Sequence, residues 1–170
     1  VSTDGAIDIG SGMNTADVIG GVGIVFNGGS VGTLTVQTSE DDIRLNGRVF
    51  LQSNLTLDTD EGAATTPTAG AGNVTFTSGS QVDSQNGTFG ATSVGAERNN
   101  LLIDAGDGLV TFNANIGQTQ RLGMLTVDRA QAGVVFGAAD AAGVGGADVV
   151  TLVSTDGAID IGSGMNTADV

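Results

Sequence analysis

A perfect internal duplication constrains the fold of this chain more than any other feature. The stretch VSTDGAIDIGSGMNTADV occupies residues 1–18 and returns unchanged at residues 153–170, an offset of 152 residues. Folding requires similarity only at inward-facing positions, so identity at every position indicates a tandem repeat copied as a unit. We therefore expect residues 1–152 to be one full period and residues 153–170 to begin the next, in a segment of something longer.

A shorter unit recurs inside the period: an apolar residue, any residue, and a second apolar residue. Successive side chains of a strand point to opposite faces, so each such triplet predicts a short strand with one buried face. The first set comprises Ile7–Ile9, Ile24–Phe26, Ile43–Leu45, Val74–Phe76, Val110–Phe112 and Val134–Phe136, and Ile159–Ile161 would open the next period.

A second triplet follows the later five, and its middle residue is Thr in four of them. This set comprises Leu34–Val36, Leu55–Leu57, Leu101–Ile103, Leu125–Val127 and Val150–Leu152. The step from the end of this triplet to the next first triplet is seven residues in four cases, as from Val36 to Ile43 and from Leu152 to Ile159. A constant step indicates that the same corner is turned each time.

These regularities favour a coil over a sandwich. Antiparallel hairpins would not need the same inward pair and the same corner in every unit, whereas a coil that winds once per unit needs both. We predict an all-β fold, a right-handed parallel β-helix (β-solenoid) of about six rungs per 152-residue period. The rungs would begin near residues 5, 23, 42, 72, 108 and 133, with Ile24 stacked over Ile7 and Phe26 over Ile9.

Composition agrees with this fold and restricts the partners. The 29 Gly residues disfavour helix, and the formal net charge is −14, from 19 acidic residues and five Arg. Such a surface repels nucleic acid and anionic membranes, and no apolar run is long enough for membrane insertion. There are no Cys residues, which excludes disulfides and thiolate metal sites.

The short repeats resemble those of a known class of bacterial protein. The pattern Gly-x-apolar-x-apolar followed by Leu-Thr-Val-Asp, at Gly108–Phe112 and Leu125–Asp128, is similar to the haemagglutinin-type repeats of large exoproteins. These are filamentous haemagglutinin-like adhesins and related passenger domains. The resemblance implies an extended, exported β-helix at the cell surface or in an extracellular matrix or biofilm, and it implies no catalytic residues.

One column of side chains suggests a metal site. Asp58, Asp104 and Asp128 each directly follow a second triplet, so stacked rungs would place the three carboxylates about 5 Å apart. The functional interpretation is a ladder that binds Ca²⁺, which prefers oxygen ligands. The alternative is a solvated edge where Asp residues cap turns, partly neutralised by Arg129 and Arg121.

Two segments interrupt the coil and leave the function open. Residues 58–72 predict a protruding loop, and residues 79–100 predict an added flap or hairpin. Either insert would suit the binding of a glycan or a host surface, so an adhesin shaft is one alternative. A polysaccharide-acting β-helix enzyme is another, although the chain has no Lys or His to assist Asp residues.

We expect a structural, non-catalytic role as the repeat unit of a long extracellular fibre. A coil without caps exposes its core and its strand edges at both ends, so adjacent copies of the repeat would cover them. The expected partners are these copies, stacked end to end or bundled laterally, together with divalent cations or polysaccharide.

Overall fold

The computed structural model consists of parallel strands, and the part of the chain that it describes contains no helix. The described residues are 2–3, 5–9, 23–28, 32–60, 72–77, 81–85, 98–137 and 152–162. Within these ranges no helix is long and apolar enough to cross a membrane. Every pairing between the named strands is parallel, as expected for a coil.

The strands form three sheets, here called A, B and C. Sheet A has six strands in the order β1 (Ser2–Thr3), β4 (Thr33–Thr38), β7 (Asn54–Asp58), β10 (Leu101–Asp104), β12 (Leu125–Arg129) and β14 (Ile159–Ile161). Sheet B has five, in the order β2 (Ile7–Ile9), β5 (Ile43–Leu45), β8 (Val74–Phe76), β11 (Leu109–Phe112) and β13 (Gly133–Phe136). Sheet C has three, in the order β3 (Ile24–Phe26), β6 (Val49–Leu51) and β9 (Val82–Ser84).

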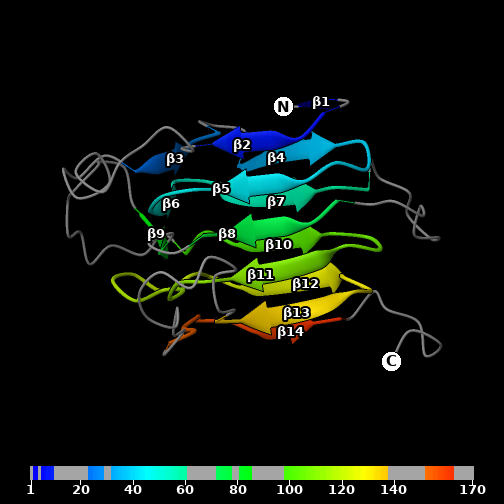
Figure 1. The fold of residues 1–170 in the computed structure, drawn as a ribbon. Helices are drawn as coiled ribbons and strands as arrows, with labels where there is room; N and C mark the ends of the chain where they lie inside the picture. The colour runs from blue at the N-terminus through cyan, green and yellow to red at the C-terminus, as the bar shows by residue number, and fades with distance from the viewer. Residues whose placement is uncertain are drawn as a thin grey trace, which may run out of the picture.

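The chain visits the three sheets in a fixed cyclic order, from B to C to A and back to B. Two bridges continue sheet C beyond β9, from Val82 to Ile116 and from Ile116 to Val153. Figure 1 shows the resulting stack, with the blue N-terminal strands at one end and the red C-terminal strands at the other. This is the arrangement of a β-solenoid, as the triplet pattern predicts.

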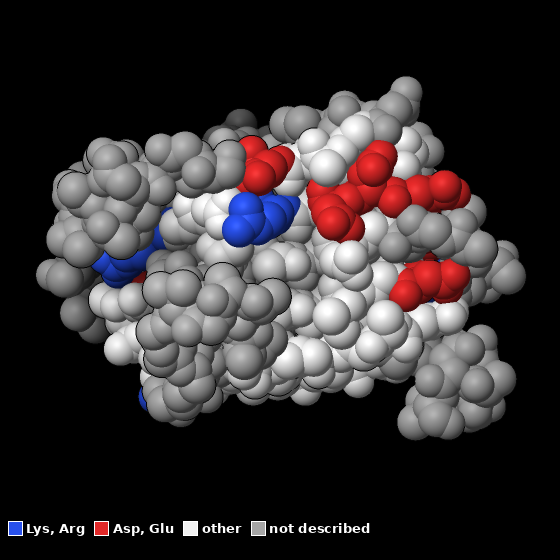
Figure 2. Space-filling view, in the orientation of Figure 1, with Lys and Arg blue, Asp and Glu red and all other residues white. Residues whose placement is uncertain are grey.

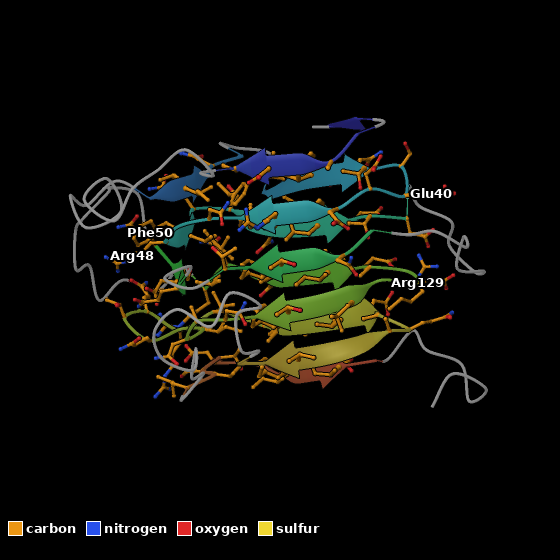
Figure 3. All side chains as sticks on the ribbon, viewed as in Figure 1. Glu40, Arg48, Phe50 and Arg129 are labelled. Carbon is orange, nitrogen blue, oxygen red and sulfur yellow. The ribbon has the colours of Figure 1, made fainter. Side chains whose placement is uncertain are left out.

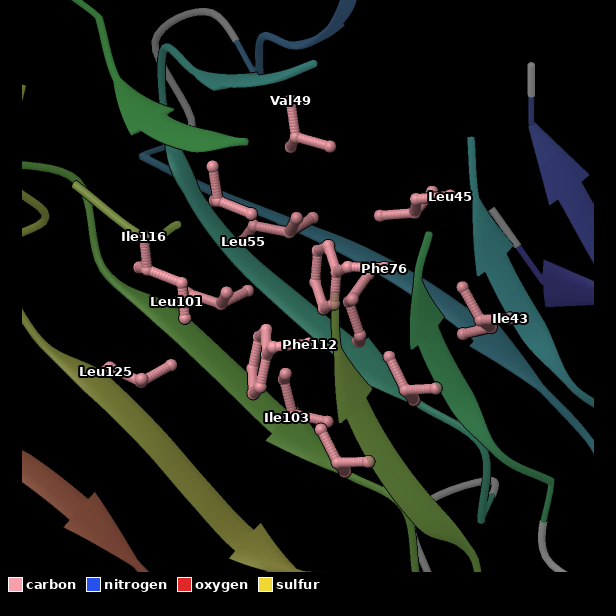
Figure 4. Packing of buried hydrophobic residues seen from close by; sticks show 14 of the residues in the cluster. Ile43, Leu45, Val49, Leu55, Phe76, Leu101, Ile103, Phe112, Ile116 and Leu125 are labelled. Atoms are coloured by element: carbon pink, nitrogen blue, oxygen red, sulfur yellow. The ribbon is translucent and has the colours of Figure 1, made fainter. Parts of the chain in front are cut away.

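Alternating burial explains why the triplets form strands. In β5 and β8 the outer residues of the triplet are buried while the middle residue is more exposed, and β7 shows the same alternation. Ile43 lies beside Val74, and Val110 beside both Val74 and Val134, so like positions stack. The rings of Phe76 and Phe112 stack at 4.9 Å in the core, and Figure 4 shows them among the aliphatic side chains.

The register of sheet A confirms four of the five second triplets. Leu34–Val36, Leu55–Leu57, Leu101–Ile103 and Leu125–Val127 lie side by side in this order, each in the predicted register. The seven-residue corners after Val36, Ile103 and Val127 therefore each lead from sheet A to sheet B. Of the fifth triplet, residues 150–151 lie outside the described residues, and Leu152 is not in a strand.

The placement predicted for Ile24–Phe26 is wrong. These residues pair with Val49–Leu51 in sheet C rather than stacking over Ile7 and Ile9. The reason is that an apolar–any–apolar triplet indicates a strand with one buried face, and all three sheets of a coil need such strands. Ile24–Phe26 therefore lies in sheet C and not in the stack of sheet B that contains Ile7.

The insert predicted at residues 79–100 also contributes to the coil. Val82–Ser84 is a strand of sheet C, in register with Val49–Leu51. Residues 79–80 and 86–97 lie outside the described residues, as do residues 61–71 of the other insert.

Candidate functional site

In the described part of the chain, the corner between sheets A and B contains two of the three buried charged residues, Asp60 and Arg129. Here it is called the acidic corner, and it comprises Thr38–Asp42, Asp58–Asp60, Asp104–Gly108 and Asp128–Ala130. Figure 2 shows acidic side chains on the side of the molecule where Figure 3 labels Glu40 and Arg129. Four small or β-branched side chains line the inside of the corner and are 0% exposed: Thr38, Thr59, Ala105 and Ala130.

Hydrogen bonds hold successive turns together at this corner. The Thr59 N–H donates to the Asp104 carbonyl at 2.9 Å, and the Ala105 N–H donates to the Arg129 carbonyl at 2.8 Å. The Thr59 hydroxyl donates to the Gly72 carbonyl at 2.7 Å. Glu40 takes a left-handed backbone conformation, with φ at 69°, as the chain leaves β4. The acidic corner is therefore a tightly hydrogen-bonded part of the coil.

The predicted column of three carboxylates is only partly correct. Asp58 and Asp104 are neighbours in register, as the spacing of the triplets indicates. Beyond them, Asp104 lies beside Arg129 instead of Asp128, because the register shifts after Ile103. Strand β12 has one extra residue at this point, and the extra residue puts a guanidinium where the third carboxylate was expected.

Arg129 is the centre of a buried ion-pair cluster. Its Nη1 atom lies 2.8 Å from Asp60 Oδ2, and its Nη2 atom lies 2.5 Å from Asp104 Oδ2. Its Nε atom also donates to Asp104 Oδ2, at 3.1 Å. Arg129 is 7% exposed and Asp60 is 2% exposed, so these charges compensate each other largely away from water.

The surroundings at this corner shift the pKa values of Asp58 and Arg129. Burial raises the pKa of Asp58, and the charges of Asp104 and Asp60 raise it further, although a hydrogen bond from the Asp60 N–H opposes the effect. Burial also lowers the pKa of Arg129, but the hydrogen bond and charge of Asp104, together with Asp60, outweigh it and raise that pKa. Arg129 therefore stays charged, whereas Asp58 is a carboxyl whose ionised form is disfavoured.

The Ca²⁺ ladder stays a prediction from the sequence, and several of the carboxylate oxygens in the column already have partners within the chain. Asp58 Oδ1 accepts the Asp60 N–H at 2.9 Å, and Asp104 Oδ1 accepts the Gly106 N–H at 3.2 Å. Ca²⁺ needs six to eight oxygen ligands, and here a guanidinium already binds the remaining oxygen of Asp104. Among the described residues, no group of three or more acidic side chains is placed to hold a metal ion. Arg129 offsets part of the negative charge at this joint between turns.

A second buried carboxylate lies in sheet C, far from the acidic corner in Figure 3, where Arg48 and Phe50 are labelled. Asp83 is 2% exposed and accepts the N–H groups of Thr119 and Gln120 at 2.9 and 3.1 Å. Arg48 lies 3.8 Å from Asp83 and stacks over the ring of Phe50. Asp83 thereby fastens the loop after Ile116 to the outer face of sheet C.

Sequence reasoning missed this second cluster. Asp83 falls within residues 79–100, where the sequence predicts an insert, so the triplet pattern does not indicate its neighbours in sheet C. A useful signal would have been the triplet-like spacing of Val82 and Ser84 around it, but Ser84 is not apolar.

The duplicated stretch occupies two different settings. Ile7–Ile9 pairs with Ile43–Leu45 in sheet B, whereas the identical Ile159–Ile161 pairs with Leu125–Val127 in sheet A. The prediction that Ile159 begins a new turn in the manner of Ile7 is therefore wrong. The cause is that Val153 continues sheet C in this turn of the coil. The next strand along the chain, β14, therefore lies in sheet A.

The last described turn leaves inward-facing apolar side chains exposed. Phe136 is 40% exposed, Ile159 49% and Ile161 42%, whereas their neighbours Phe112, Leu125 and Val127 are 0% exposed. Val153 also packs against the core but is only partly buried. Sheet B ends at β13 and sheet A at β14 within the described residues, so both present a strand edge beyond which no strand is described.

Among the residues that the structure describes, the acidic corner and the sheet C cluster thus contain the buried charges, and the end of the coil contains most of the exposed large apolar side chains. Comparison with known proteins adds no family to this description: no protein-family model matches the chain, and no curated protein or solved structure shows significant similarity to it.

Proposed function

We propose that this chain is a structural repeat unit of a long extracellular fibre, and that it is not an enzyme. The observation that carries the proposal is the open end of the coil, where Phe136, Ile159 and Ile161 are each at least 40% exposed. Exposed core residues at the end of a solenoid call for a further turn or a cap. The perfect repeat at residues 153–170 offers the further turn.

The proposed mechanism is mechanical. Backbone hydrogen bonds run along the axis through three parallel sheets, and an aliphatic core with stacked Phe rings fills the interior. The net charge of −14 keeps the outside solvated. Buried joints such as Arg129 with Asp60 and Asp104 tie one turn to the next.

We further propose that the coil is right-handed, because connections between parallel strands of one sheet have this hand in about 98% of cases. Sheet B supports a proposal for the number of turns, because it has five strands in the described residues. We therefore propose about five turns for this chain, since Ile24–Phe26 does not begin one.

Location outside the cell rests on sequence features and stays a proposal. The chain has no Cys, is strongly acidic and has short repeats that resemble those of haemagglutinin-like exoproteins. Labelling of intact source cells with an antibody to this chain should give a signal without permeabilisation. A signal seen only after permeabilisation would contradict this location.

The mass of the native polypeptide tests the fibre proposal most directly. A fibre of tandem repeats should give a polypeptide whose mass is many multiples of one 152-residue period, and electron microscopy should show rods. A native polypeptide of one period, seen as a compact particle, would overturn the proposal. Specific binding of this chain to a glycan array would favour an adhesin shaft, and scission of a polysaccharide would favour an enzyme.

A further inference from the structure

The outer face of sheet A is an uncharged surface on a strongly acidic chain. Its four central strands, β4, β7, β10 and β12, lie behind sheet B in Figure 1. Alternating burial puts every second residue of these strands on the outer face. From the start to the middle of the strands, these outer residues are Thr33, Thr35, Asn54, Thr56, Leu102 and Thr126. None of them is charged, although the chain has a net charge of −14.

Two large apolar side chains are exposed on this face. Leu102, in the middle of β10, is 37% exposed, and Met124, directly before β12, is 38% exposed. Thr56 and Thr126 are the neighbours of Leu102 in register, so short β-branched side chains surround it. Sheets that pack face to face lie about 10 Å apart and interdigitate side chains of this kind. The surface is therefore suited to a second uncharged sheet face.

Opposite charges border this face on its two sides. Where β10 and β12 end, Asp104 and Asp128 belong to the acidic corner. Arg98 and Arg121 lie a few residues before the same two strands begin. Both guanidinium groups pair with the one carboxylate of Asp156, and two positive charges against one negative charge leave an excess of one positive charge. Across the strands, the border of the face thus changes from positive to negative.

We propose that two copies of this chain bind each other through the outer faces of sheet A, with coil axes parallel and facing strands antiparallel. A two-fold axis parallel to the coil gives this arrangement and places β10 opposite β10 and β12 opposite β12. Asp104 and Asp128 of one copy would then face the side of the other copy that carries Arg98 and Arg121. A two-fold axis along the strands would instead bring the two acidic corners together, which like charges disfavour. The inference rests on the proposed function, because it takes a second copy of the repeat as the occupant.

Asp160 gives the contact one repulsive pair. It is the outer residue of β14 and lies beside Thr126 in register, so the two-fold axis would place it opposite Asp160 of the second copy. Asp160→Asn removes this repulsion and should lower the dissociation constant of the dimer about two- to fivefold. An increase in the dissociation constant would contradict the arrangement.

Sedimentation equilibrium measures the dimer. Four short strands give a small contact, so we expect a weak dimer at chain concentrations up to about 1 mM. Leu102→Lys places a charge at the centre of both faces and should raise the dissociation constant by about tenfold or more. The matched control is Val135→Lys, at a 36% exposed position of sheet B, which should leave the dissociation constant unchanged. Thermal unfolding verifies that both variants fold.

Charge substitutions test the orientation. Asp128→Lys would face Arg98 and Arg121 of the second copy, so it should raise the dissociation constant about fivefold. Arg121→Glu in the same chain should restore the dimer, because both sides of the facing pair are then reversed. The Arg121 side chain is 62% exposed, which makes this change compatible with the fold. A tighter dimer with Asp128→Lys alone, or no recovery in the double variant, would overturn the proposed orientation.

The outcomes separate this inference from the proposed function. A chain that stays monomeric up to this concentration, or equal effects of Leu102→Lys and Val135→Lys, overturns the contact. Glycan binding by a monomeric chain that Leu102→Lys abolishes would assign the face to a polysaccharide instead. If no dimer forms while the native polypeptide spans many periods, the covalent fibre stands and only the lateral contact is wrong.

Discussion

Arg129 shows how a single extra residue determines the chemistry of the acidic corner. The bulge in β12 places this guanidinium beside Asp104 of β10, and the turn beyond Asp104, which contains β7, supplies Asp60. Removing one member of a buried ion pair is costly because the remaining charges lose their partner in a poorly solvated place. The acidic corner should therefore depend on Arg129 more than on any exposed Arg.

Arg129→Met tests this dependence. The substitution keeps much of the aliphatic volume but leaves Asp60 and Asp104 uncompensated, so the free energy of unfolding should fall by about 3–5 kcal/mol. Urea denaturation measures it. The control is Arg121→Met, whose side chain is 62% exposed, and a change within about 0.5 kcal/mol is expected there. Equal, small losses in both variants would show that the buried pairs contribute little.

The raised pKa of Asp58 predicts that the free energy of unfolding decreases as this carboxyl ionises. Its pKa in the folded state is raised above the ordinary value of 3.8, so the folded chain holds this proton more tightly than the unfolded chain. Ionisation of Asp58 then costs stability as the pH rises from 3.8 through the folded pKa. Asp58→Asn removes the charge and keeps an oxygen for the Asp60 N–H, so it should stabilise at pH 7 and not at pH 3.

The comparison for Asp58→Asn is Asp156→Asn. The hydrogen bond from Arg98, with the charges of Arg98 and Arg121, lowers the pKa of Asp156, so its ionised form favours folding. Its stabilising effect is present above pH 3.8 and is lost as the pH falls through the lowered pKa. Asp156→Asn should therefore weaken the fold at pH 7, opposite to Asp58→Asn. Chemical unfolding at both pH values measures the difference, and the same sign for both variants would contradict the prediction.

At the residue scale, the neighbours Asp58 and Asp104 could be predicted, and Arg129 could not. The first two follow directly from two in-register triplets, so counting along the chain is enough. The bulge after Val127 leaves no mark in an apolar pattern, because Asp128 and Arg129 are both polar. A shift of one residue in β12 therefore places the guanidinium of Arg129 where the pattern predicts the carboxylate of Asp128.

Strands stack closely at the start of sheet B, and glycine permits this approach. A Cβ atom at Gly72 would lie 2.1 Å from the backbone C and O atoms of Asp41, and one at Gly108 would lie 2.2 Å from the Gly72 carbonyl oxygen. Successive turns therefore contact one another through glycine at this position, and a side chain would push them apart.

Gly72→Ala should disrupt this stacking. The backbone of Asp41 cannot move without shifting β5, so the substitution should cost about 1–3 kcal/mol, as overpacked positions do. Gly5→Ala is the matched control, because no heavy atom lies within 4 Å of the added Cβ, and its effect should stay within about 0.5 kcal/mol. Thermal unfolding of both variants measures the effect, and similar melting temperatures would contradict the close approach.

At the element scale, the sequence pattern predicted two sheets and missed the third. Sheets A and B consist of triplets with alternating burial, so periodicity finds them. In sheet C the middle residues Phe50 and Asp83 are also buried, at 7% and 2% exposure, because other parts of the chain cover the outer face. Burial on both faces removes the alternation on which the prediction depends. Ile24–Phe26 does alternate, so its pattern predicts a strand stacked with Ile7–Ile9 in sheet B, whereas it lies in sheet C.

For the whole molecule, the placement of the duplicated stretch sets how successive repeats are oriented. From β2 in sheet B, the chain returns to sheet B at β5, β8, β11 and β13, and it then passes through sheet C to β14 in sheet A. Residues 152–162 are fixed there by the ion pairs of Asp156 with Arg98 and Arg121 and by a hydrogen bond from the Ser154 N–H to the Ile116 carbonyl.

Intramolecular disulfides identify the sheet that holds Ile159–Ile161. In the structure Asp160 lies beside Thr126 in the neighbouring strand. Neighbouring strands are about 4.8 Å apart, a distance that a disulfide can span. The double variant Thr126→Cys with Asp160→Cys should therefore form a disulfide within one chain. Val135→Cys with Asp160→Cys should not, because β13 lies in sheet B. Asp8→Cys with Arg44→Cys is the positive control, since these residues are in register in β2 and β5. Electrophoresis of dilute, oxidised protein with and without reductant reads out each bond.

The result decides the geometry of a fibre. A bond from residue 126 to residue 160 means that 152 residues span a non-integral number of turns, so equivalent sheets of successive repeats face different directions around the axis. Their acidic corners would then be distributed around the fibre instead of forming one line. A bond from residue 135 to residue 160 would mean that the two copies of the stretch share one setting, that the pairing of β14 with β12 is wrong, and that the acidic corners align along one side.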